Sequence, residues 1–343
     1  MSQPLVSILI PNYNYARYLP ECLDSVLNQT YNNIECIISD NASTDNSWEI
    51  IENYKEKFEK RGYIFKTFRN EKNMGSSFNS NQCRDNSTGE YIYYLCSDDS
   101  IEPTFIEKGI KTFNLSENIG LVIFNRNDMD DKGIKKESIP FYNQSCIIPG
   151  EAQAAVFMMA GVAVLSQCIY KKSKSKMIIS LDKNSRFVGD WYLNFRMCMV
   201  SDVAYIKEPL YNYRQHGESE ASISIDSMLA IFEEFVMIND FVEVAKIFDK
   251  NAPIRRYDKA VKKIGGISLR YSYMALNNKN IDLARKYLMM SLVFDYDLIN
   301  SEIYQLLNNA IFNNDYKGLE KLEIFSERQI SYDPPEGYIE ISI

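Results

Sequence analysis

Short apolar runs alternate with amphipathic stretches through the first third of the chain, and no other feature limits its folding options as strongly. Amphipathic stretches with helical spacing lie at 18–29, 48–58, 76–86 and 102–113, between apolar runs at 6–10, 34–38, 63–68, 91–95 and 120–125. Strands that alternate with helices in this way are typical of α/β proteins. We therefore predict a doubly wound, mostly parallel sheet.

The pattern changes further along the chain. Between 144 and 219 it is mixed, with a helix at 189–200 and strands near 203–206 and 210–213. From 226 to 326 the spacing is almost wholly helical. The nearly apolar run 154–165 is shorter than the roughly 20 residues that a membrane helix needs, so we expect it in a buried core.

Composition narrows the class of protein. The 343 residues are 45% hydrophobic and 24% charged, as in a globular protein of two parts, and the formal net charge is −8. Nucleic-acid binders usually carry a basic domain, so we expect no nucleic-acid partner. The seven cysteines form no C-x-x-C pair, and the chain opens without a signal-peptide pattern. We therefore expect reduced thiols and a cytoplasmic location.

Polar residues follow several of the apolar runs, at 11–14, 40–41, 70 and 97–99. Ligands of parallel α/β sheets bind beyond the carboxyl ends of the strands, which is where these residues fall. Adjacent carboxylates such as Asp98 and Asp99 repel each other unless water, hydrogen bonds or a cation offsets the repulsion. A hard divalent cation prefers oxygen ligands and often shares them with a diphosphate. The alternative is a solvated loop in which Asp99 caps the next helix.

Two more strand ends point to a nucleotide. A carboxylate at Asp40 can accept a hydrogen bond from a base or a ribose, and the ring of Tyr13 can stack on a base. Each residue has a plainer explanation, since Asp40 can form a turn and Tyr13 can be a packed aromatic residue. Taken together at the ends of one sheet, they favour a nucleotide pocket.

Four ordered segments resemble the family-2 glycosyltransferases. Residues 6–14 resemble the family's opening strand, and residues 37–45 resemble its V-D-D-G-S-T-D loop with Asp40 on the first aspartate. Residues 73–91 match its N-x-G … N … G-E-Y segment, and residues 95–99 fall on its L-D-x-D-D motif. Within these motifs Cys96 and Asn41 each stand where the family has an aspartate. The resemblance covers roughly residues 4–222.

The resemblance implies a GT-A fold, Rossmann-like, followed by a smaller all-helical region. We expect a GT-A domain at 1–225, with a nucleotide-binding half at about 1–125 and an acceptor half at about 126–225. A helical region at 226–327 and an irregular tail at 328–343 would follow. The implied donor-binding residues are Pro11, Tyr13, Asp40, Asn73, Asp99 and Arg214, and Asp98 is the implied metal ligand.

Two later segments complete the implied site. Gly189-Asp190 falls on the family's E-D site, where Asp190 would be the general base, although a helix-capping aspartate has the same position. Residues 213–216, with Ser219 and Ser222 beyond, resemble the family's Y-R-x-H … S segment. Arg214 can donate to phosphate through its fork, and His216 can bind metal or phosphate, although a lone histidine is often structural.

The implied reaction is sugar transfer from a nucleoside diphosphate donor, with a UDP-sugar favoured, by an inverting single displacement assisted by Mn²⁺ or Mg²⁺. The acceptor would be a glycan or a lipid-linked hydroxyl in surface polysaccharide biosynthesis. Glycosidase chemistry explains the carboxylates but not Tyr13 or the strand-end layout. A catalytically impaired relative that serves as a binding or scaffold subunit is the alternative, and Cys96 and Gly189 are the departures that favour it.

Two clusters of basic residues are candidates for contact with a membrane surface. They lie at 171–176 (Lys171, Lys172, Lys174, Lys176) and at 255–263 (Arg255, Arg256, Lys259, Lys262, Lys263). Either cluster could contact anionic lipid head groups at the inner membrane face, and either could be an ordinary solvated surface. The paired helices expected at 281–312 could form an acceptor wall or a homodimer contact, and the sequence leaves that choice open.

Overall fold

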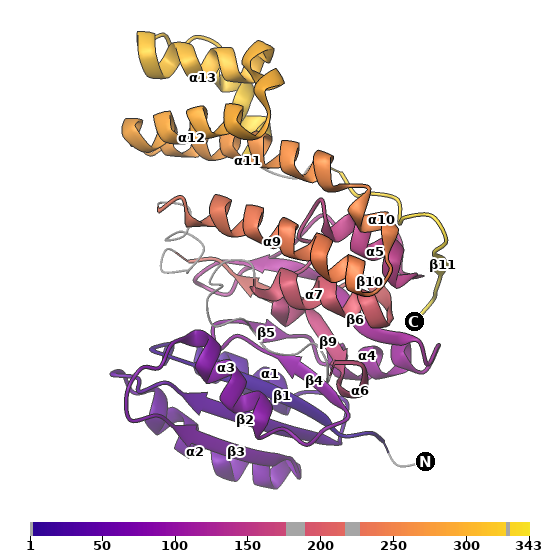
Figure 1. Cartoon of the computed structure of the whole chain (residues 1–343). Helices are drawn as coiled ribbons and strands as arrows, with labels where there is room; N and C mark the ends of the chain where they lie inside the picture. Colours follow the sequence, from indigo (N-terminus) through magenta and orange to yellow (C-terminus); the bar gives the residue numbers. More distant parts are fainter. Residues whose placement is uncertain (1–2, 176–188, 217–226, 327–329) are drawn as a thin grey trace.

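The computed structural model describes residues 3–175, 189–216, 227–326 and 330–343 (Figure 1). These residues contain one sheet of eleven strands, in which the strands follow the order β11-β8-β10-β6-β9-β4-β1-β2-β3. Two short strands lie off this path, since β5 (Ser100–Ile101) pairs with β10 and β7 (Lys135–Glu137) pairs with β6.

The first part of the sheet is parallel, as predicted. Its order is β3-β2-β1-β4, and each neighbouring pair runs in the same direction. The strands are β1 (Val6–Asn12), β2 (Ile34–Asp40), β3 (Ile64–Arg69) and β4 (Tyr91–Tyr94). The helices that connect them are α1 (Leu19–Leu27), α2 (Ser47–Arg61) and α3 (Ser76–Asp85). The predicted α/β alternation is therefore confirmed in this half.

Beyond β4 the sheet is mixed, which corrects the expectation of a mostly parallel sheet. Strand β9 (Cys168–Lys171) lies between β4 and β6 (Ile119–Met129) and is antiparallel to both. Strand β10 (Asp202–Arg214) is parallel to β6 and antiparallel to β8 (Cys146–Ile148). The two short strands expected at 203–206 and 210–213 are one strand, which has register shifts on both sides of Pro209 and another between Asp202 and Val203.

Alternating side chains of β1 divide the interior into two layers, because successive residues of a strand face opposite sides of the sheet. Ile8 and Ile10 pack in one cluster with side chains of α1, α2 and α4 (Phe105–Phe113). Leu9 belongs to the other cluster, which α3, α5 (Gly150–Phe157) and α7 (Gly189–Val200) share. The expected burial of the run 154–165 is confirmed at Ala154 and Phe157, which have no exposed surface.

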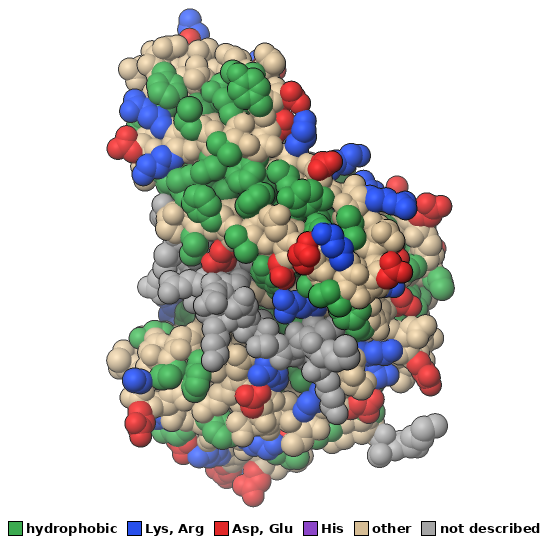
Figure 2. Space-filling model, viewed as in Figure 1, with side chains coloured by type: hydrophobic (Ala, Val, Ile, Leu, Met, Phe, Trp, Pro, Cys, Tyr) green, Lys and Arg blue, Asp and Glu red, His purple; other side chains and the backbone are tan. Residues whose placement is uncertain are grey.

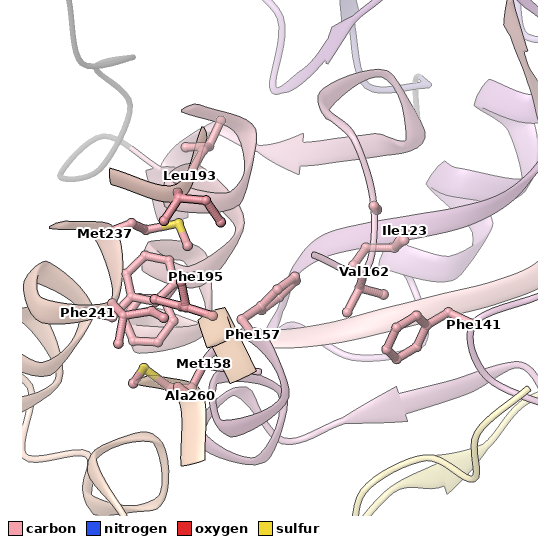
Figure 3. Close-up of a cluster of buried hydrophobic side chains, with 14 of the residues drawn as sticks. Ile123, Phe141, Phe157, Met158, Val162, Leu193, Phe195, Met237, Phe241 and Ala260 are labelled. Carbon is pink, nitrogen blue, oxygen red and sulfur yellow. The ribbon is translucent and has the colours of Figure 1, made fainter. Parts of the chain in front are cut away.

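The helices after residue 228 extend this second cluster away from the sheet (Figure 1). Phe195 of α7 stacks on Phe241 of α9, with ring centroids 3.8 Å apart and planes within 4° (Figure 3). The described helices of this region are α9 (Leu229–Ile247), α10 (Asn251–Ile254), α11 (Tyr257–Asn277), α12 (Ile281–Phe294) and α13 (Glu302–Asn313), with 3-10 turns at Tyr296–Asn300 and Leu319–Ser326. The helix carrying the predicted base is thus packed directly against the C-terminal helices.

Hydrophobic side chains gather over the C-terminal helices on the face shown in Figure 2. The most exposed large ones in this region are Ile247, Val293, Tyr296 and Val236. Among the described residues, no helix combines the length and the apolar character that a membrane crossing requires.

Lysines of both basic clusters form hydrogen bonds or ion pairs within the protein. Lys172 donates to the carbonyl of Ser87 at 2.7 Å. Lys262 forms ion pairs with Asp295 and Asp297, and the ammonium of Lys263 donates to the carbonyl of Met159. Lys176 lies outside the described residues. The second cluster is therefore not a continuous solvated face.

The tail beyond residue 330 is mostly irregular, but it returns to the sheet. Strand β11 (Ile339–Glu340) pairs antiparallel with β8. Tyr332 exchanges two backbone hydrogen bonds with the 141–143 segment, and its ring packs on Phe141 with centroids 5.3 Å apart. The tail therefore crosses from the helical region to the far edge of the sheet.

Candidate active site

The carboxyl ends of β1 and β2 form a buried polar cluster around Asp40. Its side chain has no exposed surface. One carboxylate oxygen accepts from Asn12 Nδ2 at 2.9 Å and from Ser43 Oγ at 2.5 Å, and the other accepts from the Ser43 N–H at 3.1 Å. Arg69 Nε lies 3.8 Å away. Asp40 is therefore held in one orientation before any ligand arrives.

Amide side chains extend this cluster to the start of α3. Asn41 donates to Asn73 Oδ1 at 2.8 Å and to the Gly75 carbonyl at 3.2 Å, and it accepts from Asn70 Nδ2 and the Met74 N–H, both at 3.0 Å. Gly75 has φ +90°, a conformation in which a side chain would be strained. Asn73, the predicted neighbour of the base, is fixed beside the strand ends by these bonds.

An open pocket lies next to this cluster. It has a volume of about 470 Å³ and is lined by Ala42, Ser43, Arg69, Asn70 and Glu71. Tyr13 follows β1 directly and is 41% exposed, so its ring is available for stacking. Pro11 is half-buried in β1. The structure thus places the predicted base-binding residues on the same pair of strand ends, with Asp40 beneath the surface.

The loop after β4 carries the predicted metal ligand. Donor atoms of Cys96, Asp98 and Asp99 all lie within 4.8 Å of one another. His216 Nε2 lies 3.0 Å from Asp98 Oδ2, and the histidine side chain is only 1% exposed. Carboxylate oxygens with an imidazole nitrogen suit Mn²⁺, and oxygen ligands suit Mg²⁺. This donor set therefore fits the divalent cation that the motifs imply.

Asp99 faces the interior. Its side chain accepts hydrogen bonds from the Tyr211 hydroxyl and, at 2.8 Å, from the Arg214 N–H. Burial, reinforced by the charge of Asp98, raises the pKa of Asp99 well above its usual range. The donor contact predicted for Asp99 stays a prediction, and it would have to share these oxygens.

Arg214 is buried and binds the main chain of the same loop. Its Nε donates to the Asp98 carbonyl at 2.8 Å, and one terminal nitrogen donates to the Asp130 carbonyl at 3.0 Å. The other terminal nitrogen contacts Glu21 Oε2 at 2.5 Å. Its guanidinium carbon lies 4.6 Å from the ring centroid of Tyr18. The phosphate contact predicted for Arg214 stays a prediction that must rely on its remaining N–H groups.

Asp190 opens α7 and lies close to the metal loop. Burial raises its pKa to about 6, although backbone N–H groups of Trp191, Leu165 and Asp190 itself favour the charged form. The Trp191 N–H donates to its Oδ1 at 2.7 Å. A carboxylate with this pKa is largely ionised near neutral pH yet still able to accept a proton.

A 3-10 turn, Leu165–Gln167, lies between the predicted base and the metal loop. Its Leu165 N–H favours the charged form of Asp190. On the other side, Ser166 Oγ contacts Cys96 Sγ and accepts from the Cys96 N–H, both at 3.2 Å. Burial raises the pKa of the Cys96 thiol well above its usual range, and the charges of Asp99, Asp98 and Asp190 add to this rise. Ser219 and Ser222 lie outside the described residues.

Several residues of the site carry no sequence signal of their own. Glu21 looks like an ordinary helical acid, Ser166 belongs to no motif, and Tyr211 lies within an apolar strand. Each is identified only by its contacts with Arg214, Cys96 and Asp99. Asn12 is the exception, because it lies within the polar cluster after the first strand and could have been singled out there.

Comparisons with known proteins bear on the family and on the fold. Residues 7–167 match the family described as glycosyl transferase family 2. An uncharacterized glycosyltransferase, alr2836 of Nostoc sp., is 29% identical over 218 residues, which are 62% of this chain and 65% of that protein. The putative glycosyltransferase EpsH of Bacillus subtilis is 32% identical over 64% of this chain and 63% of its own length. The chain thus spans slightly less than two thirds of both relatives.

The fold is similar to that of a solved structure. Staphylococcus aureus TarS 1–349, in complex with UDP, superposes with a TM-score of 0.56 over 91% of this chain and 93% of that chain. The sequence identity is 13%, so this likeness concerns the fold alone. It confirms the GT-A type of α/β fold expected from the motifs. With the match over residues 7–167, slightly less than half of the chain, the chain is similar in sequence and fold to the family-2 glycosyltransferases.

Proposed function

We propose that the protein transfers a sugar from a nucleoside diphosphate donor to a hydroxyl of a glycan or lipid-linked acceptor, with inversion at the anomeric carbon. A UDP-sugar is the favoured donor, because the Asp40 cluster and pocket occur at the strand ends where a base would bind and TarS is a UDP complex. The proposed setting is surface polysaccharide biosynthesis in the cytoplasm, at or near the inner membrane face.

The observation that carries this proposal is the approach of Asp190 to the metal loop. In the turn Leu165–Gln167, Ser166 contacts Cys96 and the Leu165 N–H favours the charged form of Asp190. A displacement at the anomeric carbon requires a base close to that carbon, near the diphosphate end of the donor but on the opposite face of the sugar. The Asp40 cluster supplies the other end of the donor site.

In the proposed reaction the acceptor hydroxyl attacks the anomeric carbon from the face opposite the diphosphate. The new glycosidic C–O bond forms as the bond to the diphosphate oxygen breaks, and the hydroxyl proton passes to a carboxylate oxygen of Asp190. The electron pair of the broken bond leaves with the diphosphate. The pKa of about 6 at Asp190 lies near the operating pH, where a general base works best.

Asp98 and His216 are the residues that would hold the divalent cation. When bound, the cation stabilises the negative charge of the departing diphosphate. The protein contributes the orientation of Asp98, whose carboxylate contacts His216 and whose main chain is held by Arg214. It also contributes the buried setting of His216, whose ring lies against Tyr15 and Tyr18 with centroids 5.6 and 5.5 Å away.

The test is turnover with purified full-length protein. Thermal stabilisation by UDP, GDP, CDP and dTDP, each with and without Mn²⁺, first identifies the donor class. A nucleotide at about 100 times its dissociation constant adds about 2.7 kcal/mol of stability. Release of that nucleoside diphosphate from its sugar is then measured with candidate glycan and lipid-linked acceptors.

Asp190→Asn is expected to abolish release while nucleotide stabilisation persists. The same stabilisation without any sugar transfer by the wild type would favour the binding or scaffold alternative. Absence of stabilisation by all four nucleotides would contradict the donor site itself.

A further inference from the structure

We infer that Glu21 is a positioning residue of the donor site, which orients the metal-binding loop through Arg214 without contacting the ligand. The inference rests on the proposed function, because the loop concerned carries Asp98. Glu21 belongs to none of the four motifs that identify the family, and its role follows from contacts alone.

The carboxylate of Glu21 contacts both strands next to the metal loop, β5 and β10. Its Oε1 accepts from Ser100 Oγ at 3.1 Å, and its Oε2 accepts from a terminal nitrogen of Arg214 at 2.5 Å. Ser100 begins β5, directly after the metal loop, and Arg214 ends β10, which pairs with β5. One side chain of α1 therefore ties both strands at the point where the loop leaves the sheet.

Arg214 passes this restraint to Asp98. Its side chain is 2% exposed, and its Nε donates to the main-chain carbonyl of Asp98. A buried guanidinium needs a negative partner, because an uncompensated buried charge is strongly unfavourable. Glu21 is the carboxylate that contacts the guanidinium directly, while the bonds to the carbonyls of Asp98 and Asp130 are made with neutral acceptors and Asp99 accepts from the Arg214 main chain. Neutralising Glu21 therefore loosens the group that holds the Asp98 main chain.

Glu21 also joins the two ends of the donor site. It lies in the first turn of α1, which follows the 13–18 segment carrying Tyr13. The ring of Tyr18, at the start of that helix, lies under the Arg214 guanidinium and beside His216.

The experiment compares Glu21→Gln with Glu107→Gln in the full chain. Glu107 is a matched control, since it also occupies the first turn of a helix and pairs with a cation, Lys111, away from the site. Mn²⁺ affinity is measured from the electron paramagnetic resonance signal of free Mn²⁺, with the nucleoside diphosphate that stabilises the wild type. Nucleotide affinity without metal is measured by calorimetry in EDTA.

Glu21→Gln is expected to weaken Mn²⁺ binding by about tenfold, which is the lower end of the range for groups that support metal ligands. Its nucleotide affinity in EDTA should equal that of the wild type. Glu107→Gln should match the wild type in both affinities. Equal Mn²⁺ affinity in Glu21→Gln and wild type would overturn the inference. A loss of nucleotide affinity in EDTA as large as the loss of Mn²⁺ affinity would overturn it too. If Glu21→Gln does not fold, Glu21→Asp keeps the charge on a shorter side chain and is expected to lose about threefold. An unchanged Glu21→Asp would then overturn it. A wild type that binds neither nucleotide nor Mn²⁺ contradicts the proposed function instead.

Discussion

The two ends of the proposed donor site are built from different interactions. At the base end, the oxygens of the buried Asp40 accept hydrogen bonds from the neutral side chains of Asn12 and Ser43, and Arg69 Nε lies 3.8 Å away. At the metal end, the contacts are between ionisable groups: Asp98 with His216, and Arg214 with Glu21. The base end is held mainly by hydrogen bonds from neutral groups, whereas the metal end is held mainly by contacts between charged or ionisable groups.

This difference separates stability from ligand response. A buried network that is fully satisfied stiffens the fold, and losing one donor leaves a partner unpaired. A charge cluster with a raised carboxyl pKa, such as Asp99, gains when a cation enters. We therefore expect substitutions at the base end to lower stability and substitutions at the metal end to lower metal affinity.

The largest expected effect is at Asp98. Asp98→Asn removes a charged oxygen ligand, and we expect Mn²⁺ affinity to fall by about 100-fold or more, beyond the effect of a residue that only supports a ligand. The melting temperature of the metal-free protein should change little, because the Asp98 side chain is 17% exposed and contacts only His216 among the bonds described for its carboxylate. Mn²⁺ titration and thermal unfolding in EDTA measure the two quantities. A large loss of metal-free stability would erase the contrast between the two ends.

Asn12 offers the converse substitution. Asn12→Ala removes the donor that contacts both Asp40 and Ser43, in a site without solvent exposure. We expect the free energy of unfolding to fall by about 2 kcal/mol, since a buried carboxylate oxygen loses a partner. Denaturant unfolding measures this change, and Mn²⁺ affinity at saturating nucleotide should stay near the wild-type value. The comparison fails if Asn12→Ala changes metal affinity more than stability.

The pH dependence tests whether catalysis belongs to the metal end. Asp190 must be ionised to accept a proton, and burial raises its pKa to about 6. Turnover should therefore rise with pH through this value, and at pH 5 it should be about a tenth of its plateau. Nucleotide affinity in EDTA, which reports the base end, should not follow this profile. A flat rate between pH 5 and pH 7 at saturating metal and donor would remove Asp190 from the role of base.

The smallest expected effect is at Cys96, where the family has an aspartate. Cys96→Asp adds an oxygen ligand within the group of donor atoms that lie within 4.8 Å of one another. We expect Mn²⁺ affinity to rise about three- to tenfold, because hard cations prefer carboxylate to thiol. Cys96→Ser is the matched control, since it changes the donor atom without adding a charge. Weaker Mn²⁺ binding by Cys96→Asp would show that the thiol suits this loop better than a carboxylate.

The parallel half of the sheet and its strand ends were predictable because their signals are local. Each of the first four strands coincides with a short run in which apolar residues predominate, and Asp40 and Asp98 lie at or shortly after the ends of two of these runs. The antiparallel insertion of β9 was not predictable, since Cys168–Lys171 is only four residues long and its partners lie far away in the chain. Pairing across the sheet depends on tertiary packing, which short apolar runs do not encode.

The site was predictable where a residue contacts the ligand and not where it supports another residue. Glu21 and Arg214 are separated by 193 positions, and neither pattern of neighbouring residues indicates the ion pair. The burial of Arg214 was not predictable either, because an arginine near a histidine at a strand end is equally compatible with an exposed phosphate contact. A supporting role is visible only once the strands β5 and β10 are seen side by side.

The pairing of β11 with β8 has a consequence for the order in which the protein is synthesised. Strand β8 is translated early, yet its partner at Ile339–Glu340 leaves the ribosome only after all of the helices from α9 to α13. During that interval the edge of β8 lacks its last neighbour, and unpaired edges are where nascent chains associate wrongly. The sheet therefore gains its edge strand on this side only after the helices α9 to α13 have been made, so a chain that stalls within the helices would leave the edge of β8 unpaired.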